Sequence, residues 1–325
     1  MFPFRYIKAT DEQSALTAAA SGARYIAGGT TLVDLMRETV ERPETVVDIN
    51  ALPYTSIDLR ADGVRIGSLV RMSDLAAHPG VRQQIPMIAE ALELSASAQL
   101  RNMASIGGNL MQRPRCLYFR DVSALCNRRD PGSGCAAIGG HNRTHAILGI
   151  SEQCVATHPS DLAVVLVALD AVMVVRNASG ERRIAIADFY RRPGTTPQHE
   201  NTLRAGELIV AVDVPIGTEA RRSGYLKVRD RESFEFALAS AAVALDITAG
   251  TVRTARVAVG GIGTVPWRLP TVERALRGQP VSAEVFRNAA SLAAEGAKPL
   301  SENGFKVELV KRTVERQLTT VAAMP

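Results

Sequence analysis

The sequence predicts an α+β protein made of two domains or three small ones. The chain has 325 residues, and domains contain about 150 residues on average. Predicted strands and helices alternate along residues 1–52 and 53–220, whereas residues 221–325 contain strands first and helices afterwards. Strands followed by helices are typical of an α+β layer domain, so we assign the third segment to a domain of its own.

The composition excludes several classes of protein. Hydrophobic residues make up 46% and charged residues 22% of the chain, which is usual for a globular protein and not for a disordered or fibrous one. The net charge is +5, but the basic residues are scattered and aromatic residues reach only 5%. We therefore expect no nucleic-acid-binding groove, which would need a basic face with stacking rings.

The chain also lacks the apolar segments that direct proteins to membranes. Its first residues, MFPFRYIKATDEQ, lack the unbroken apolar core of a signal peptide, and its longest apolar stretch, 162–175, is interrupted by Asp170. We expect no export signal and no membrane-spanning segment in this chain. The protein would then reside in the cytoplasm, or reach the periplasm by export together with a partner that carries a signal.

Local patterns predict the elements of the first segment. Thr10 and Gln13 form a predicted capping box for a helix that begins in SALTAAA. The next apolar run is ended by the pair Gly28 and Gly29. The further elements expected here are a strand over residues 23–27, a helix from residue 31 with Leu32, Leu35 and Met36 on one face, and a strand over residues 45–49.

The other two segments are interpreted in the same way, except for residues 111–145, which show little periodicity. In the second segment we expect strands over residues 63–70 and 206–215, a helix over residues 86–97 that begins near Pro86, and a helix leading into a strand in DLAVVLVALDAVMVV. In the third segment we expect antiparallel strands in YLKVRD, FALASAAVALDI and VRTARVAVGGIG, and helices around residues 271–277, 282–296 and 305–320.

All four cysteines of the chain, Cys116, Cys126, Cys135 and Cys154, lie within one window of 39 residues, with the spacing C-x9-C-x8-C-x18-C. This clustering suggests a shared role, although four unrelated buried thiols are an alternative. Two disulfides would suit an oxidising compartment, which nothing else in the sequence indicates. Structural zinc sites usually bring their ligands in tight C-x2-4-C pairs, which are missing here.

Loop cysteines at wide spacing can hold a [4Fe–4S] cluster, and several arginines surround them. A cluster with four thiolates is negatively charged, so nearby guanidinium groups would stabilise its reduced form and raise its potential. Spacing and charge together favour a [4Fe–4S] cluster over zinc. The arginines concerned are Arg113, Arg115, Arg120, Arg128, Arg129 and Arg143.

Two glycine pairs suggest a site for phosphate groups. AGGTT (27–31) lies between a predicted strand and a predicted helix, where inward-facing N–H groups and the helix N-terminus can hold a pyrophosphate. SIGGNL (105–110) is a second such loop, with the polar side chains of Ser105 and Asn109. Neither matches the dinucleotide-binding or P-loop motif, so each signal alone is weak. The pattern HPSDLA predicts that Asp161 is the N-cap of a helix.

A series of motifs covers nearly the whole chain: AGGTTLVDLM, QLRNMASIGGNL, HPSDLAVVLVALDA, a strand ending in VDVP, and YLKVRD. In this order they resemble the FAD-binding medium subunit of the molybdenum hydroxylases, the xanthine dehydrogenase and carbon monoxide dehydrogenase flavoprotein family. The resemblance implies a two-lobed FAD-binding domain of the PCMH/VAO type over residues 1–52 and 53–220. It implies a CO dehydrogenase flavoprotein C-terminal-like α+β domain over residues 221–325.

The cysteine-rich insertion, at about residues 111–154, departs from most of that family. RCLYFRDVSALCNRRDPGSGCAA resembles the cluster-binding insertion in the FAD subunit of bacterial periplasmic aldehyde oxidoreductases, and a similar insertion belongs to 4-hydroxybenzoyl-CoA reductase. The stretches RDRESFEFALAS and SENGFKVELVKRT also resemble the aldehyde oxidoreductase subunit. The resemblance implies that the four cysteines ligate a [4Fe–4S] cluster.

The resemblance assigns FAD contacts residue by residue and implies no catalytic residue. The first FAD loop is matched by Ala27, Gly28, Gly29, Thr30, Thr31 and Leu32, and the second by Ser105, Ile106, Gly107, Gly108 and Asn109. Asp161 matches an FAD-contacting acid, Ile209 stands where an aliphatic side chain packs against the isoalloxazine, and Lys227 stands where a cation lies near the flavin. Such a cation would favour the anionic reduced ring.

The function implied is that of an electron-transfer subunit with FAD and a [4Fe–4S] cluster. Its partners would be a large molybdenum-cofactor subunit and a small [2Fe–2S] subunit, with electrons passing through FAD to an external acceptor as aldehydes are oxidised to carboxylic acids. Alternatives are the equivalent subunit of a 4-hydroxybenzoyl-CoA reductase-like or xanthine dehydrogenase-like complex, a stand-alone flavin oxidase, and a zinc-stapled binding module. A stand-alone oxidase would need a base over the flavin, for which we find no candidate.

Overall fold

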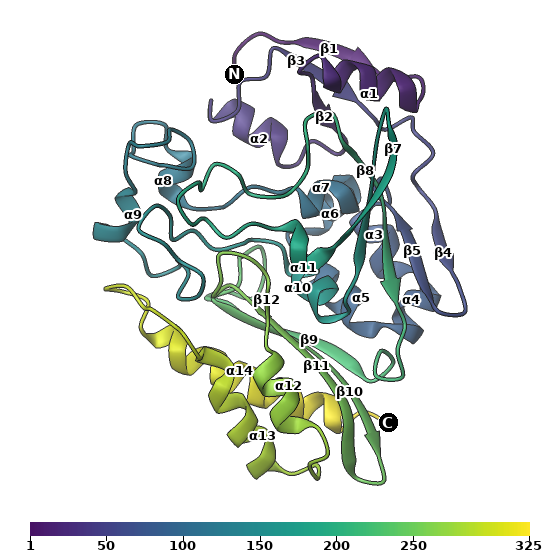
Figure 1. Cartoon of the computed structure of the whole chain (residues 1–325), viewed down its shortest axis with the longest axis vertical. Coiled ribbons are helices and arrows are strands. Elements are labelled where there is room, and N and C mark those ends of the chain that lie inside the picture. The colour runs from purple at the N-terminus through teal and green to yellow at the C-terminus, as the bar shows by residue number, and fades with distance from the viewer.

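The computed structural model describes residues 1–325 and contains three β-sheets, each in a different part of the molecule (Figure 1). The N-terminal sheet is parallel, with the strand order β1-β3-β2. Its strands are β1 (Arg5–Lys8), β2 (Arg24–Ile26) and β3 (Thr45–Asp48), and its helices are α1 (Glu12–Ala20) and α2 (Leu32–Arg37). The strands and helices predicted for this segment are confirmed.

Helix α1 begins differently from the prediction. Asp11 is its N-cap, and the Asp11 carboxylate accepts a hydrogen bond of 2.7 Å from the backbone N–H of Ser14, while the backbone N–H of Asp11 donates to Ser14 Oγ at 3.2 Å. The capping box predicted at Thr10 and Gln13 was therefore wrong by one residue. Aspartate is the stronger N-cap because its carboxylate accepts more strongly than a threonine hydroxyl.

The central sheet has five antiparallel strands in the order β4-β5-β8-β6-β7. Its strands are β4 (Ile57–Leu59), β5 (Gly63–Gly67), β6 (Val172–Asn177), β7 (Gly180–Ala185) and β8 (Leu208–Pro215). Its helices are α3 (Met72–Ala77), α4 (Pro79–Gln84), α5 (Pro86–Glu93), α6 (Ala98–Met103), α7 (Ile106–Leu110), α10 (Asp161–Ala168) and α11 (Ile186–Phe189). Helix α10 is apolar on every side and fully buried, as expected for a helix enclosed between two layers.

The C-terminal sheet is antiparallel, with the order β12-β11-β10-β9. Its elements are β9 (Ser223–Val228), β10 (Ala239–Thr248), β11 (Thr251–Gly260), β12 (Trp267–Arg268), α12 (Pro270–Leu276), α13 (Ala283–Ala290), the 3-10 helix Ser291–Ala294 and α14 (Phe305–Ala322). Helices α12 to α14 cover one face of this sheet, while α5 and α10 pack against its other face (Figure 1). The predicted α+β fold and its order of strands and helices are confirmed.

The cysteine lobe, residues 111–155, lies beside the central sheet and carries only two short helices (Figure 1). These are α8 (Leu117–Arg120) and α9 (Ala136–Gly139). Asn127 holds its turns together: Asn127 Oδ1 accepts from the backbone N–H groups of Gly132 and Gly134, and Asn127 Nδ2 donates to the Gln153 carbonyl. In the whole structure, no helix is both long and apolar enough to span a membrane.

Candidate functional site

The first glycine loop, residues 27–32, follows β2 and leads into α2. A Cβ on Gly28 would lie 1.8 Å from the carbonyl oxygen of Met103, so only glycine allows this close approach to the chain in front of the second loop. Gly29 has a φ of +72°, which favours glycine for a different reason. The backbone N–H groups of residues 28–32 donate no hydrogen bond within the protein. These free donors suit the oxygen atoms of a pyrophosphate.

Arg71 and Asn50 fasten the two glycine loops to each other. Arg71 donates to the Met103 carbonyl at 2.5 Å and to Asn50 Oδ1 at 2.9 Å, and Asn50 Nδ2 donates to the Ala27 carbonyl at 3.0 Å. The position of the first loop is therefore set by hydrogen bonds that reach across to the second lobe.

The second glycine loop forms the start of α7. Ser105 is the N-cap, and its hydroxyl accepts a hydrogen bond of 3.1 Å from the backbone N–H of Gly108. A Cβ on Gly107 would lie 3.0 Å from the Ser68 side chain, so this loop also packs closely against its neighbour. Ile106 is fully buried, and Asn109 accepts a hydrogen bond of 2.6 Å from Ser160 Oγ.

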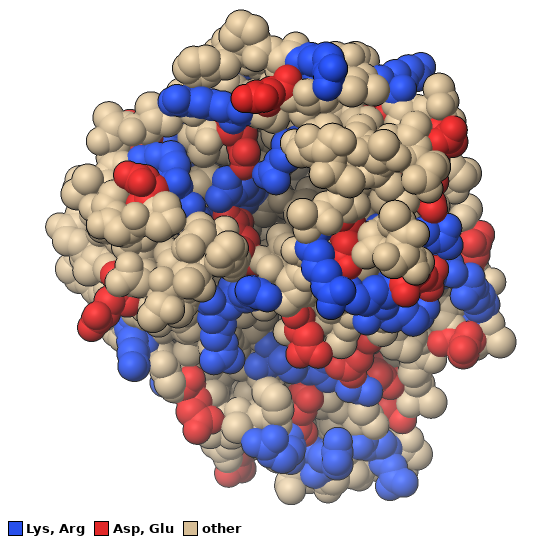
Figure 2. Space-filling view, turned by 45° about the horizontal axis from the view of Figure 1, so that its top comes forward, with Lys and Arg blue, Asp and Glu red and all other residues tan.

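Both loops line one cavity of about 950 Å³, at the upper end of the range for small-molecule sites. Residues 27–32, Ser105, Gly107, Gly108 and Ile209 contribute to its wall. Figure 2 shows a hollow on one face of the molecule with basic and acidic side chains gathered around it. The size, the free N–H groups and the aliphatic Ile209 together fit an extended dinucleotide such as FAD.

The far wall of this cavity has no sequence motif. It is formed by residues 198–201 and 203–209, which lead into the central strand β8, and by Glu41 and Arg113. Arg113 joins these parts, since it lies 2.6 Å from Glu41 Oε1 and 2.7 Å from Glu200 Oε1. Sequence reasoning missed this wall because its residues come together only through packing of distant segments.

Asp161 and Lys227 form a buried network and, like Ile106 and Asn109, are not among the residues that line the cavity. Lys227 Nζ lies 2.7 Å from Asp161 Oδ2, and the Asp161 carboxylate also accepts from Tyr225 Oη at 2.6 Å and Ser95 Oγ at 2.9 Å. Burial and the Asp161 charge raise the pKa of Tyr225 well above its usual value. The reading of Asp161 as an N-cap was wrong: Ser160 caps α10, because its hydroxyl accepts from the backbone N–H of Ala163.

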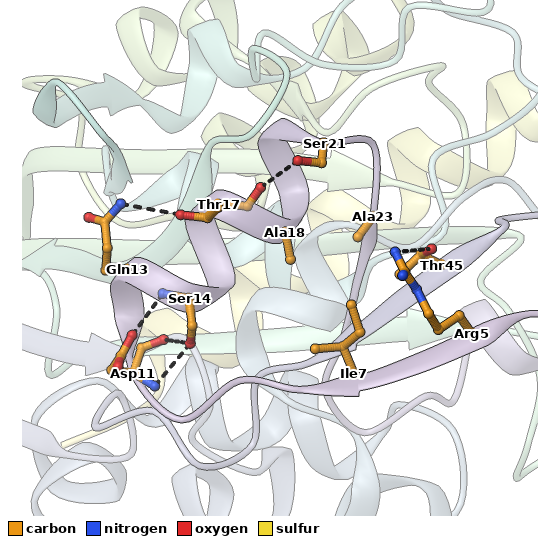
Figure 3. A pocket seen from close by; sticks show the side chains of 10 residues that line it. All are labelled: Arg5, Ile7, Asp11, Gln13, Ser14, Thr17, Ala18, Ser21, Ala23 and Thr45. Carbon is orange, nitrogen blue, oxygen red and sulfur yellow. Dashed lines mark hydrogen bonds between the residues drawn. The ribbon is translucent and has the colours of Figure 1, made fainter.

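A second open groove, of about 570 Å³, lies between α1 and β1 (Figure 3). Its polar side chains already have partners: Arg5 donates to Thr45 Oγ1, Gln13 donates to Thr17 Oγ1, and the Asp11 carboxylate accepts from the backbone N–H of Ser14. With these groups already satisfied, the groove offers no clear set of ligand-binding donors.

The cysteine lobe brings the four thiols into one region, and all four are free. Cys126 and Cys135 face each other in an isolated β-bridge. Burial raises the pKa of the Cys116 thiol to about 12, and the nearby Cys154 and Cys126 add to the rise. No group of three or more His, Cys, Asp or Glu side chains has the arrangement that would hold a metal ion.

Two further side chains touch these thiols. His145 Nε2 lies 3.1 Å from Cys116 Sγ, and Arg128 Nη2 donates to Cys154 Sγ at 3.5 Å. Burial lowers the pKa of His145 to about 4, and the Lys306 charge adds to this effect, so the imidazole is neutral at neutral pH. Burial keeps the Cys116 thiol neutral in the free protein, and these polar contacts would stabilise the sulfur atoms as thiolates once a metal centre binds them.

Of the six arginines expected around the cysteines, only Arg128 contacts a thiol. Four of the others attach the lobe to its surroundings through carboxylates, and Arg129 binds backbone carbonyls within the lobe. Arg113 pairs with Glu41 and Glu200, Arg115 with Asp34, Arg120 with Asp34 and Glu38, and Arg143 with Asp230, while Arg129 donates to the carbonyls of Tyr118, Phe119 and Ala124. Most of these arginines therefore stabilise the position and the fold of the cysteine lobe.

The segment 298–306, which leads into α14, clasps the cysteine lobe to the C-terminal domain. The backbone N–H of Asn142 donates to Glu302 Oε2 at 2.9 Å, and the backbone N–H of Glu302 donates to Asn142 Oδ1 at 3.0 Å. Asn303 Nδ2 donates to the His145 carbonyl at 3.2 Å. Asn142 and Asn303 are fully buried, so loss of either amide would leave unsatisfied groups that cost about 1–3 kcal/mol.

We expect Lys306, the last residue of this clasp, to make stability rise with pH. Lys306 Nζ donates to the carbonyls of Thr144 and Gly261. Burial lowers its pKa from 10.5 to about 7, with a further contribution from the Arg143 charge that Asp230 opposes. Between pH 7 and 10 the unfolded chain therefore binds a proton that the folded chain has released, so the free energy of unfolding increases with pH.

Urea unfolding at pH 7 and pH 10 tests this expectation. We subtract the free energy of unfolding of Lys306→Met from that of the wild type. This difference should be larger at pH 10 than at pH 7, by an amount on the order of a few kcal/mol. Parallel pH profiles for the two proteins would show that Lys306 stays charged in the folded state.

Comparison with known proteins agrees with this architecture. The family model for the FAD binding domain in molybdopterin dehydrogenase matches residues 2–217, and that for the CO dehydrogenase flavoprotein C-terminal domain matches residues 224–321. The aldehyde oxidoreductase FAD-binding subunit PaoB of Escherichia coli (strain K12) is 44% identical, over 97% of this chain and 96% of its own length. The glyceraldehyde dehydrogenase medium chain of Sulfolobus acidocaldarius is 27% identical, over 99% of this chain and its whole length.

Solved structures share the fold. Quinoline 2-oxidoreductase from Pseudomonas putida 86 matches with a TM-score of 0.77 and 22% identity, over 99% of this chain and 98% of the other. Carbon monoxide dehydrogenase from Oligotropha carboxidovorans matches with a TM-score of 0.78 and 20% identity, over the full length of both chains. From its sequence and its fold, the chain belongs to the FAD-binding medium subunits of the molybdenum hydroxylases, a family of oxidoreductase subunits.

Proposed function

We propose that this protein is the FAD- and [4Fe–4S]-binding electron-transfer subunit of a molybdenum-dependent aldehyde oxidoreductase. The observation that carries the proposal is the presence of two candidate cofactor sites in one chain, the glycine-lined cavity and the four-cysteine lobe. The similarity to PaoB over nearly the full length supports aldehydes as the substrate class. Bound FAD would supply a carrier that accepts two electrons and releases one or two at a time.

The cavity residues divide the binding of FAD between them. The free N–H groups of residues 28–32 would hold the pyrophosphate, and Ser105, Gly107 and Gly108 would form the opposite side of the cradle. Ile209 would pack against the isoalloxazine ring. These groups are held in place by the tight packing at Gly28 and Gly107, so little ordering is needed on binding.

We also propose Ile106, Asn109, Asp161 and Lys227 as members of the FAD site. Ile106 and Asn109 would fix the second loop from behind, through the core and through Ser160. Lys227 Nζ uses two of its three N–H groups on Asp161 and the Leu94 carbonyl. The third N–H would be available to the flavin ring, with Asp161 holding the ammonium in position.

The chemistry of its donors supports the proposal of an iron–sulfur cluster in the cysteine lobe. Its four thiols are free, and two of them already have polar neighbours at sulfur: His145 at Cys116 and Arg128 at Cys154. We propose Cys116, Cys126, Cys135 and Cys154 as the ligands of a [4Fe–4S] cluster. A large molybdenum-cofactor subunit and a small [2Fe–2S] subunit would complete the complex, located in the periplasm after joint export or in the cytoplasm.

Dependence on partners is the test of this function. The FAD-loaded chain alone should oxidise no aldehyde, because in the proposed complex the molybdenum subunit carries out the oxidation and this chain only passes on the electrons. Mixed with its molybdenum and [2Fe–2S] subunits, it should support aldehyde-dependent reduction of an artificial acceptor. Aldehyde oxidation by the isolated chain would favour the stand-alone flavin oxidase. Activity of the complex on a purine or an aromatic acyl-CoA, with none on aldehydes, would favour the other two kinds of complex.

A further inference from the structure

An ion-pair chain connects the cysteine lobe with the wall of the FAD cavity. Arg128 Nη2 donates to Cys154 Sγ at 3.5 Å, and Arg128 Nη1 lies 3.4 Å from Glu200 Oε1. Glu200 lines the cavity, and its carboxylate lies 2.7 Å from Arg113, which lines the cavity as well. One buried guanidinium thus touches a proposed cluster ligand on one side and a residue of the flavin site on the other.

Burial makes this connection electrostatically strong. The side chains of Arg128 and Glu200 are only 5% and 17% exposed, so solvent screens their charges weakly. Arg113 also pairs with Glu200 but touches no cysteine, so Arg128 is the arginine of the lobe that contacts both a thiol and a residue of the cavity wall. A change of charge at Cys154 therefore acts electrostatically on Arg128, and through Arg128 on Glu200.

The region between the two sites is polar as well as charged. Arg128, His158 and Glu200 line a small cavity of about 20 Å³, which has room for about one water molecule. Arg128 Nε and His158 Nε2 are both buried here without a hydrogen-bond partner in the protein. His158 Nδ1 accepts from the backbone N–H of Ser160, so in the neutral ring the Nε2 atom carries the proton and is a donor. Two N–H donors without a partner therefore lie beside the pair of Arg128 and Glu200.

We propose that Arg128 and Glu200 couple the two cofactor sites, so that each residue sets the reduction potentials of both the cluster and the flavin. This inference rests on the proposed function, because it takes Cys154 as a cluster ligand. The positive charge and hydrogen bond of Arg128 stabilise the reduced, more negative cluster and raise its potential. Arg128 also offsets the negative charge of Glu200, which would otherwise disfavour the anionic reduced flavin. Arg128 and Glu200 thus act on the two redox centres through their charges and take no part in the electron transfer themselves.

The inference predicts the sign of four changes. Arg128→Gln should lower the midpoint potentials of both centres, since the cluster loses its cation and Glu200 loses part of its compensation. Glu200→Gln should raise both, although Glu200 touches no cysteine. Arg128→Lys, which keeps the charge, should recover part of the cluster potential. Arg143→Gln is the matched control, because Arg143 is half exposed, pairs with Asp230 and touches no cysteine, so it should change neither potential.

Anaerobic spectroelectrochemical titration of the full chain, loaded with FAD and iron, measures both potentials in each variant. The inference is overturned if Arg128→Gln keeps its iron with an unchanged cluster potential, or if Glu200→Gln shifts the flavin potential alone. If Arg128→Gln loses iron, the Glu200→Gln variant provides the test. A rise of both potentials in Glu200→Gln supports the inference, and a shift of the flavin potential alone overturns it. Iron and flavin contents of the wild type separate this inference from the proposed function: a wild type without iron overturns the function itself.

Discussion

We expect the Gly28→Ala and Gly29→Val variants to fold without bound FAD. The Cβ introduced by Gly28→Ala would meet the Met103 carbonyl oxygen at 1.8 Å, and because that atom belongs to the backbone, the first loop must move away from the second. At Gly29 a β-branched side chain would be strained at a φ of +72° and would press on Val33 at 3.1 Å. Several backbone hydrogen bonds to the pyrophosphate would be lost together, and at about 1 kcal/mol each the affinity should fall roughly 100-fold or more.

Flavin content after gel filtration, with circular dichroism as the test of folding, measures this effect. Gly304→Ala is the control, because a Cβ there has no atom within 4 Å and Gly304 lies in the clasp, outside the residues that line the cavity. Normal FAD content in folded Gly28→Ala would mean that this loop is a turn and no part of the flavin site.

The second large effect is expected at the cysteines. Cys116→Ser and Cys135→Ser should lose iron and sulfide and still bind FAD, because neither cysteine lines the cavity and the glycine loops do not depend on the cysteine lobe for their hydrogen bonds. Ser123→Ala is the control, since the Ser123 hydroxyl is exposed and donates only to Asp121. Metal, sulfide and flavin assays on anaerobic preparations distinguish the variants. Loss of FAD together with iron would show that FAD binding depends on an intact cluster, and an equal amount of zinc with no iron would exclude the cluster.

Much of the fold could be predicted because its signals are local. Strands β10 and β11 are long apolar runs joined by a tight turn, and α10 is an apolar run of helical length. The glycine pairs marked the two loops, although the reason for Gly28 lies in Met103, far along the chain, and so could not be predicted. The start of α1 was misplaced because Thr10 and Asp11 are neighbouring capping candidates, and only the backbone geometry chooses between them.

The parts of the site that could not be predicted depend on tertiary contacts. Residues 198–209 carry no motif, and they reach the cavity because β8 occupies the centre of the five-stranded sheet. Six arginines in the cysteine region look alike in the sequence, yet only Arg128 is directed at a thiol, because Glu200 holds its other end. Likewise, nothing in the sequence marks His145 as the neighbour of Cys116. Clustering of the cysteines was the one signal strong enough to identify this lobe in advance.

The cofactor content of the anaerobically purified full chain tests the central claim most directly. We predict one FAD together with about four iron and four sulfide per chain, and a visible spectrum in which flavin bands lie on a broad shoulder near 400 nm, about where sulfur-to-iron transitions of a cubane absorb. FAD without iron would contradict the claim of two redox centres in one chain, and so would zinc in place of iron.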